Sequence, residues 1–181
     1  TGFGGSCFPK DLKALYAFAK SNNKSAELLQ SVINVNLNQP KETIQLLKQK
    51  VGNIKGKRIT VLGLAFKPGT DDIRESPSIR IIEELISLEA NVMCHDPIAI
   101  ENMKLIFSDN IVSYFYDLKD ALQKTEAVIL VTSWPEYNQL KDLINRSIPV
   151  IDGRRFLNKN DFKNYVGIGL NNKINSWEQI K

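Results

Sequence analysis

The sequence predicts an α/β fold in which a doubly wound, mainly parallel sheet follows a long helical segment. Two observations lead to this prediction. Residues 1 to about 52 carry apolar side chains at helical spacing and no strand signal. From Lys57 onward, short β-rich runs alternate with helical patterns, which is typical of parallel strands joined by helical crossovers. We therefore expect a helical segment over residues 1–52 and a sheet domain over residues 53–181.

The helical segment begins with a glycine-rich turn and then shows an apolar helical face over residues 11–20. The pair Asn22-Asn23 is expected to end this helix. A second apolar stripe follows and contains Pro40. Because proline lacks an N–H and clashes with the preceding turn, Pro40 either kinks one long helix or opens a new one. We favour one long kinked helix.

The sheet domain is predicted to contain six strands. The run AVILV at 127–131 is the most apolar and is expected at the centre of the sheet, whereas 111–115 is expected at an edge. The other expected strands are residues 58–63, 91–95, 150–151 and 165–168, and the expected helices are residues 78–88, 98–104 and 118–124. Such sheets bind ligands at the carboxyl ends of their strands, so we expect the ligand crevice there.

This strand-helix order is Rossmann-like, but the first strand does not end in a dinucleotide-binding turn. It ends GLAFKPG over residues 63–69 rather than G-x-G-x-x-G. The glycines that let backbone approach a pyrophosphate are therefore not in place. We expect no NAD site on this sheet, which argues against a stand-alone NAD-binding protein.

Composition narrows the classes of function. Hydrophobic residues make up 43% and charged residues 24% of the chain, as in ordinary soluble proteins, and the longest apolar run is too short to span a membrane. The net charge of +4 is spread along the chain, and its richest basic stretch, residues 48–58, lacks interleaved aromatics. We expect that stretch to be a solvated linker and not a nucleic-acid site. The two cysteines form neither a metal pair nor a disulfide framework, so we expect a cytoplasmic setting.

Residues 2–11, GFGGSCFPKD, carry the strongest chemical signal. The glycines permit close approach of a ligand, and Pro9 suits the first turn of a helix that would start at Cys7. The positive end of that helix and Lys10 would favour a thiolate, with Asp11 one turn away. A thiolate can attack a carbonyl to form a covalent intermediate. By spacing alone, a small buried cysteine in a tight turn remains an equal alternative.

The same ten residues resemble the active-site signature of UDP-glucose and GDP-mannose dehydrogenases. Residues 63–77, GLAFKPGTDDIRESP, and residues 152–155, DGRR, resemble further motifs of this family, and HDP at 95–97 resembles its aromatic-Asp-Pro. The order and spacing of the motifs agree with the family over nearly the whole chain. The resemblance implies the C-terminal part of a nucleotide-sugar 6-dehydrogenase whose NAD-binding domain lies upstream of Thr1. We therefore expect this chain to be inactive by itself.

The resemblance also implies a reaction and a set of site residues. The family oxidises a sugar C6 alcohol to a carboxylate with two NAD, through a thiohemiacetal and a thioester on cysteine. By match to the motif, Cys7 would be the nucleophile and Asp11 the carboxylate that helps to activate water. The residues implied to bind the nucleotide sugar are Gly2, Phe3, Gly4, Phe66, Lys67 and Arg154. The residues implied to contact NAD are Lys10 and Arg74.

Several alternatives stay open at this stage. Arg155 competes with Arg154 for the inward position. UDP-glucose is the first expected substrate, because Phe8 and residues 66–77 resemble that branch; GDP-mannose is second and an N-acetylated amino sugar last. A homodimer through the long helix is the expected assembly, and polysaccharide precursors are the expected use of the product. The rival interpretation is a non-catalytic nucleotide-sugar-binding module in which the motif survives without chemistry.

Five other residues receive a structural interpretation. We expect His95 to be a turn or edge residue and not a base, Cys94 to lie in the core, and Trp134 to pack. Asp71 and Asp72 resemble a metal pair, but Arg74 follows them and no other ligands cluster nearby. We therefore expect these carboxylates to form loop hydrogen bonds, with no metal bound.

Overall fold

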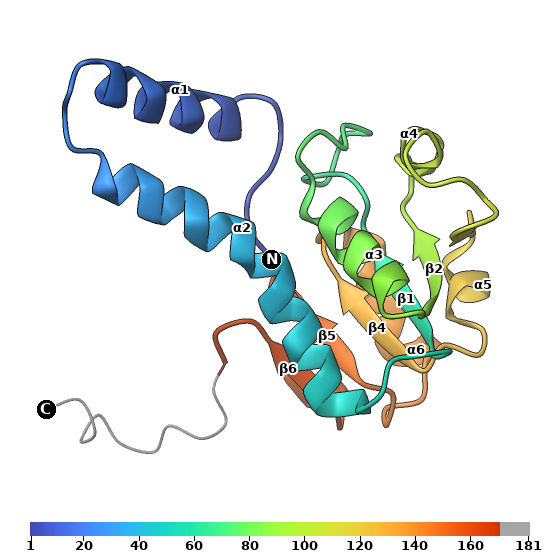
Figure 1. The fold of residues 1–181 in the computed structure, drawn as a ribbon. Coiled ribbons are helices and arrows are strands. Elements are labelled where there is room, and N and C mark those ends of the chain that lie inside the picture. The colour runs from blue at the N-terminus through green and yellow to red at the C-terminus, as the bar shows by residue number, and fades with distance from the viewer. Residues whose placement is uncertain (171–181) are drawn as a thin grey trace, which may run out of the picture.

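The computed structural model describes residues 1–170 and confirms an α/β fold built on a six-stranded sheet (Figure 1). The strand order is β3-β2-β1-β4-β5-β6, and every strand pair is parallel. The strands are β1 (Arg58–Leu62), β2 (Asn91–His95), β3 (Ser113–Tyr114), β4 (Ala127–Leu130), β5 (Val150–Asp152) and β6 (Tyr165–Gly167). Because the chain moves one way along the sheet from β1 to β3 and the other way from β4 to β6, the topological switch lies between β1 and β4.

Helices precede the sheet and cover both of its faces. They are α1 (Phe8–Ser21), α2 (Glu27–Val51), α3 (Pro77–Ser87), α4 (Ile100–Lys104), α5 (Leu118–Leu122) and α6 (Leu140–Leu143), with 3-10 helices η1 (Pro135–Gln139) and η2 (Lys159–Asp161). One core cluster joins α2, α3 and α4 to the sheet, and the other joins α5, η1 and α6 to it. Among residues 1–170, no helix has the length and apolarity needed to cross a membrane.

The helical segment forms a hairpin that projects from the sheet domain, with α1 alongside the first half of α2 (Figure 1). The predicted break after α1 is confirmed, because Asn22 caps the helix and Asn23 follows with a φ of 53°. The second helix is continuous through Pro40, which is buried inside it. Of the two readings of this proline, the structure supports one long helix.

The second half of α2 packs on the sheet. Ile44 and Leu47 are buried in the same cluster as Ile59 of β1 and Ile129 of β4. Apolar burial of this kind contributes about 25 cal/mol per Å², so α2 is anchored by its C-terminal half. The helix therefore belongs by packing to both parts of the chain, and the division at residue 52 stays a prediction.

The strands agree with the sequence pattern in position and order. All four residues of β4 are buried, and this strand lies in the middle of the sheet, as its apolar run predicts. The third strand is at an edge, as expected, but it is shorter than predicted. Ile111 and Val112 both donate their N–H to Ser108 O, at 2.9 and 3.2 Å, so they form a turn before β3 begins.

Candidate functional site

The glycine-rich loop, residues 2–5, lies at the carboxyl ends of the central strands and is fixed from three directions. Arg154, which follows β5, donates from Nη1 to Gly2 O at 3.1 Å. Asn36 of α2 exchanges two hydrogen bonds with the backbone of Phe3. Gly5 N donates to Arg74 O, in the loop after β1, at 2.8 Å. The three motifs that the sequence singled out therefore meet at this loop, in the crevice where sheets of this topology bind ligands.

Two of the glycines are required by the space around them. A Cβ on Gly4 would lie 2.3 Å from Glu75 O, a backbone atom that cannot rotate away. Gly5 has a φ of +88°, and a Cβ there would lie 2.7 Å from the ring of Phe66. Glycine is the residue that tolerates both the positive φ and the close approach. The loop is therefore pressed against the loop that follows β1, with Phe66 between them.

The change Gly5→Ala is expected to lower the free energy of unfolding by about 2–5 kcal/mol, since it adds overpacking to left-handed strain. Gly69 is the matched control: its φ is +80°, but a Cβ there would meet nothing within 4 Å. We expect Gly69→Ala to cost only the strain, about 1–2 kcal/mol. Urea unfolding of both variants measures the difference, and equal losses would show that the contact with Phe66 is unimportant.

Cys7 is exposed and immediately precedes α1, so its predicted place at a helix N-terminus is confirmed. Its carbonyl accepts the first helical hydrogen bond from Asp11 N at 2.8 Å, and Ser6 Oγ lies 3.7 Å from its sulfur. Lys10 Nζ is 3.4 Å from Asp11 Oδ1, and both side chains are mostly exposed. A thiol, a carboxylate and an ammonium thus lie together at the start of one helix, exposed to solvent.

The second motif begins with a turn that is fixed by a buried carboxylate. Asp96, just after β2, accepts hydrogen bonds from five donors, and it is 1% exposed. These donors are the backbone N–H groups of Leu64, Ala65, Ile98 and Ala99 and the indole N–H of Trp134. Every lone pair of this carboxylate is therefore engaged in holding loops, and the packing role expected for Trp134 includes a hydrogen bond to it.

Phe66 and Lys67 follow directly from this fixed turn. Phe66 is partly buried against Gly5, and Lys67 is exposed, with Nζ 5.4 Å from the centre of the Phe66 ring. An exposed ammonium on a rigid base is suited to a phosphate group as a point charge. Within residues 1–170 the Lys67 ammonium forms no ion pair, so it could meet an anionic ligand beside the glycine-rich loop.

Arg74 pairs with Asp72 in a two-bond fork, with Nε–Oδ1 at 2.9 Å and Nη2–Oδ2 at 2.7 Å. This hydrogen bond with Arg74 lowers the pKa of Asp72 and raises the pKa of Arg74. Asp72 also accepts from Arg74 N at 2.9 Å, so it forms the loop hydrogen bonds that we expected of it. The Arg74 side chain is exposed and is held by Asp72. Its contact with NAD stays a prediction.

Between the two neighbouring arginines, Arg154 faces the loop and Arg155 is exposed. Arg154 donates from Nε to Val131 O at 2.7 Å and from Nη1 to Gly2 O. Burial lowers the pKa of Arg154, and the nearby carboxylate of Asp152 opposes that shift. Arg154 is thus a brace between backbone carbonyls, and any contact with substrate would use its remaining donors.

His95 is not the turn or edge residue that we expected. It is 2% exposed and ends β2, which pairs on both sides. Its Nδ1 lies 3.2 Å from the hydroxyl of Tyr137, which also donates to His95 O, and 3.8 Å from Glu136 Oε1. No sequence pattern indicates this contact, because Tyr137 is 42 residues away and reaches the strand only through the fold. Cys94, its neighbour, is buried in the core as expected.

Burial lowers the pKa of His95 below its ordinary value of 6.5. The unfolded chain then binds a proton that the folded chain resists, so the stability is complete above pH 6.5 and declines as the pH falls below it. The slope is at most about 1.4 kcal/mol per pH unit. We expect His95→Gln to flatten the stability profile between pH 6.5 and about 5 in urea unfolding. An unchanged slope would mean that another group causes any acid loss in that window.

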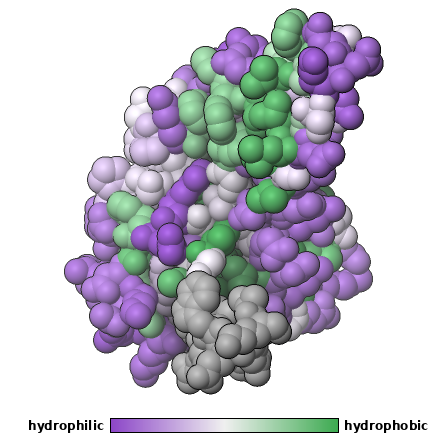
Figure 2. Space-filling model, turned by 90° about the vertical axis from the view of Figure 1, so that its left-hand side faces the viewer, coloured by the Kyte–Doolittle hydropathy of each residue, from purple (hydrophilic) through white to green (hydrophobic). Residues whose placement is uncertain are grey.

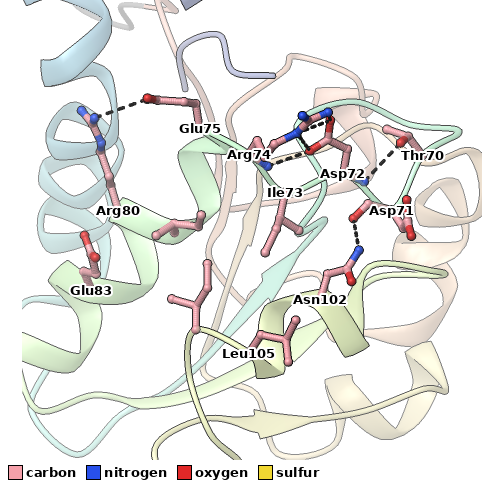
Figure 3. Close-up of a pocket in the computed structure, with 12 residues that line it drawn as sticks. Thr70, Asp71, Asp72, Ile73, Arg74, Glu75, Arg80, Glu83, Asn102 and Leu105 are labelled. Carbon is pink, nitrogen blue, oxygen red and sulfur yellow. Dashed lines mark hydrogen bonds and ion pairs between the residues drawn. The ribbon is translucent and has the colours of Figure 1, made fainter. Parts of the chain in front are cut away.

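A broad surface groove lies between α3 and α4, beneath residues 70–75 (Figure 3). Leu105 and Asn102 form one side, and Asn102 Nδ2 donates to Asp71 O at 2.9 Å. Of the residues predicted from the motifs, only Arg74 borders it, and Figure 3 shows Arg74 turned toward Asp72. The groove borders the glycine-rich loop through Arg74 and Glu75, but none of the other predicted site residues lines it, so the loop remains the candidate site.

Sequence reasoning missed two residues that hold this junction. Asn36 lies among other asparagines on an exposed helix, so nothing in the pattern distinguishes it. Glu75 was part of a motif without a role; it accepts from Lys13 Nζ at 2.8 Å and lies 3.8 Å from Arg80. It thereby joins α1 to the sheet domain, and its own φ is +52°.

Known proteins match the chain along both of its parts. Residues 60–159 match the UDP binding domain of the UDP-glucose/GDP-mannose dehydrogenase family, and residues 1–38 match the central domain of that family. The UDP-glucose 6-dehydrogenase AglM of Haloferax volcanii is 42% identical over 169 residues, which are 92% of this chain and 39% of the relative. The chain therefore spans well under half of that relative's length.

Solved structures agree with this match. A UDP-glucose dehydrogenase from the archaeon Pyrobaculum islandicum superposes with a TM-score of 0.86 at 38% identity, covering 94% of this chain and 38% of that one. A GDP-mannose dehydrogenase from Pseudomonas aeruginosa gives a TM-score of 0.77 at 25% identity, covering 92% and 39%. The matched regions include all three motifs that meet at the glycine-rich loop, and the chain belongs to the UDP-glucose/GDP-mannose dehydrogenase family.

Proposed function

We propose that the whole protein is an NAD-dependent UDP-glucose 6-dehydrogenase and that this chain supplies its nucleophile and its UDP-sugar site. The observation that carries the proposal is the convergence of three motifs on one loop. Arg154, Asn36 and Arg74 fix residues 2–5 beside the exposed sulfur of Cys7. UDP-glucose is favoured over GDP-mannose by the identities. The two UDP-glucose dehydrogenases named above are 42% and 38% identical to this chain, and the GDP-mannose dehydrogenase is 25% identical.

The residues of this chain do not fit NAD on their own sheet. The turn after β1 lacks the glycine pattern. In dinucleotide-binding sheets a carboxylate near the end of β2 binds the ribose, but here that carboxylate, Asp96, already accepts hydrogen bonds from five protein donors. Lys10 and Arg74 are exposed cations, and they would contact the pyrophosphate of an NAD held outside this sheet. When bound, NAD accepts the hydrides that the oxidation releases.

The side chains of this chain account for the other events. Once the C6 alcohol is an aldehyde, the sulfur of Cys7 adds to its carbon and a thiohemiacetal forms, which keeps the aldehyde bound. Oxidation of that adduct gives a thioester. Water then attacks the acyl carbon, Asp11 accepts the proton, and the C–S bond breaks to release the carboxylate and the thiolate. Gly2, Phe3 and Gly4 would line the sugar, a role that suits a loop whose backbone is fixed at each end.

The diphosphate and the base would lie toward the sheet domain. Phe66 and Lys67 project from the turn that Asp96 holds, and Arg154 lies beside the glycine-rich loop, where it donates to Gly2 O. The product would be a UDP-linked uronate, used as a polysaccharide precursor. Cys7 and Cys94 are both free thiols, which is consistent with the cytoplasmic setting that we propose.

We also propose that the helical hairpin forms a homodimer. Figure 2 shows apolar side chains gathered over α1 and the first half of α2. The exposed apolar residues of these helices are Phe8, Leu15, Phe18, Leu28, Val35 and Leu37. Soluble proteins rarely leave such a surface uncovered, and a self-complementary helical face suits a two-fold contact.

Calorimetric titration tests the ligand site. We expect UDP-glucose to bind this chain, GDP-mannose to bind more weakly and NAD not to bind. Lys67→Ala should weaken UDP-glucose binding about 10- to 100-fold, because a charge-assisted contact to phosphate is lost. Lys141→Ala removes an exposed lysine of α6 and serves as the matched control. Equal loss in both variants, or no preference for UDP-glucose, would contradict the assignment.

A further inference from the structure

Asn36 forms hydrogen bonds with both backbone groups of a single residue in the glycine-rich loop. Its Oδ1 accepts from Phe3 N at 2.7 Å, and its Nδ2 donates to Phe3 O at 3.1 Å. The two bonds together fix which end of the carboxamide faces which backbone group. Asn36 comes from the middle of α2, 33 residues along the chain, and is partly buried. The Asn36 side chain therefore forms the hydrogen bonds to the Phe3 N–H and carbonyl that a neighbouring strand forms in a sheet.

This contact supplies two of the hydrogen bonds that fix the loop. Gly2 and Gly5 are each held through one hydrogen bond, whereas Phe3 is held through two. Gly2 has a φ of +94°, and a Cβ added to it would lie 2.7 Å from Oδ1 of Asn36, which is too close. The loop and the carboxamide are thus shaped to each other.

Phe3 connects the loop to α1, the helix that begins directly after Cys7. Its ring meets the ring of Phe8 edge-on, with centroids 4.5 Å apart, and Phe8 is the first residue of α1 and the neighbour of Cys7. Edge-to-face aromatic pairs of this kind contribute about 0.5–1.5 kcal/mol beyond burial. A continuous set of contacts therefore runs from α2 through Asn36, Phe3 and Phe8 to Cys7.

We propose that Asn36 is a positioning residue for the oxidation: it sets the pose of residues 2–4 against the sugar and the direction of Cys7. The inference rests on the proposed function and adds to it a residue that would act through the backbone of Phe3. Asp96 fixes the turn that carries Phe66 and Lys67, although Phe66 also lies against Gly5, so we expect binding of the nucleotide part to depend little on Asn36. Loss of Asn36 should therefore misplace the reacting carbon and leave the diphosphate bound.

The test is steady-state kinetics of the whole protein with UDP-glucose and NAD. We expect Asn36→Leu, which keeps the shape and removes both hydrogen bonds, to lower kcat about 10- to 100-fold, the scale of an ångström-sized misplacement. The KM for UDP-glucose should change less than about twofold. Asn38→Leu, at an exposed position on the same helix, is the control and should keep both constants. A kcat of Asn36→Leu within twofold of the wild type, or an equal fall in the control, would overturn the proposal.

Asn36→Asp adds a readout that a merely structural role would not move. The carboxylate keeps an acceptor for Phe3 N but repels Phe3 O, and protonation restores a donor toward that carbonyl. We expect the ratio of variant to wild-type kcat to rise at least about threefold as the pH falls from 8 to 5.5, since an anion facing a carbonyl protonates readily. A flat ratio would contradict the role of the donor, even if Asn36→Leu fails to fold.

Hydrogen exchange separates this inference from the proposed function. In the present chain, without substrate, the Phe3 amide should be protected, and Asn36→Leu should remove that protection while the amides of β4 stay protected. An unprotected Phe3 amide in the wild type would refute the hydrogen bonds between Asn36 and Phe3, whether or not the whole protein is active. Conversely, a wild-type protein that fails to reduce NAD with UDP-glucose would refute the proposed function and leave the exchange result unchanged.

Discussion

Replacing Cys7 by serine in the whole protein should reduce the formation of UDP-glucuronate by about a thousandfold or more. A serine hydroxyl is a far weaker nucleophile than a thiolate, so the acyl intermediate neither forms nor breaks down at a useful rate. The fold should be unaffected, because Cys7 is exposed and, within residues 1–170, its side chain forms one hydrogen bond, a weak one with Ser6 Oγ. Product formation, followed by chromatography of the nucleotides, measures the effect.

Cys94→Ala is the matched control for this experiment. Cys94 is the other free cysteine, but it is buried in the middle of β2 and faces the core. Burial raises the pKa of its thiol well above the usual range, and with 0% of the residue exposed its sulfur is not accessible to a ligand at the glycine-rich loop. The control should keep its turnover and lose some stability. Near-normal turnover in Cys7→Ser would refute covalent catalysis at this position.

Asp96→Ala should lower the free energy of unfolding by about 3–5 kcal/mol. The change leaves five donors without their acceptor, and each buried donor that loses its partner costs about 1–3 kcal/mol before relaxation and water reduce the total. The loops after β1 and after β4 would separate, because Leu64 N and the Trp134 indole share the same carboxylate oxygen. Urea unfolding followed by circular dichroism measures the loss.

Asp142→Ala provides the comparison, because this carboxylate is exposed on α6. It should change the stability by no more than about 0.5 kcal/mol. Trp134→Phe removes a single donor and should cost about 1 kcal/mol, well short of the alanine variant. If Asp96→Ala were no worse than Asp142→Ala, the carboxylate would not be the tie between the loops.

Much of the fold follows from local pattern. The run AVILV predicted a buried central strand, and residues 91–95 predicted β2 at its observed bounds, because strongly apolar or alternating runs allow few other structures. The pattern around Pro40 left one long kinked helix and a new helix open; we favoured the long helix, and the structure has one helix there. The short edge strand was less predictable: only Ser113 and Tyr114 pair with β2, since Ile111 is already committed to a turn.

The candidate site was only partly predictable. The motifs indicated which residues matter, but not that Arg154 braces backbone carbonyls or that His95 is buried against Tyr137. Contacts to backbone groups leave little sequence pattern, because every residue type has the carbonyl and every one but proline has the N–H. For the same reason Asn36 could not be distinguished from Asn34 or Asn38 before its partner was seen.

The central claim is that Cys7 forms a covalent acyl adduct with the sugar of UDP-glucose. The most direct measurement is acid quenching of the whole protein during turnover with UDP-glucose and NAD, followed by mass spectrometry of the peptide that contains Cys7. The account predicts a peptide heavier by the UDP-glucuronyl acyl group, absent without NAD and absent in Cys7→Ser. Continued turnover with Cys7 unmodified at every time point would contradict it.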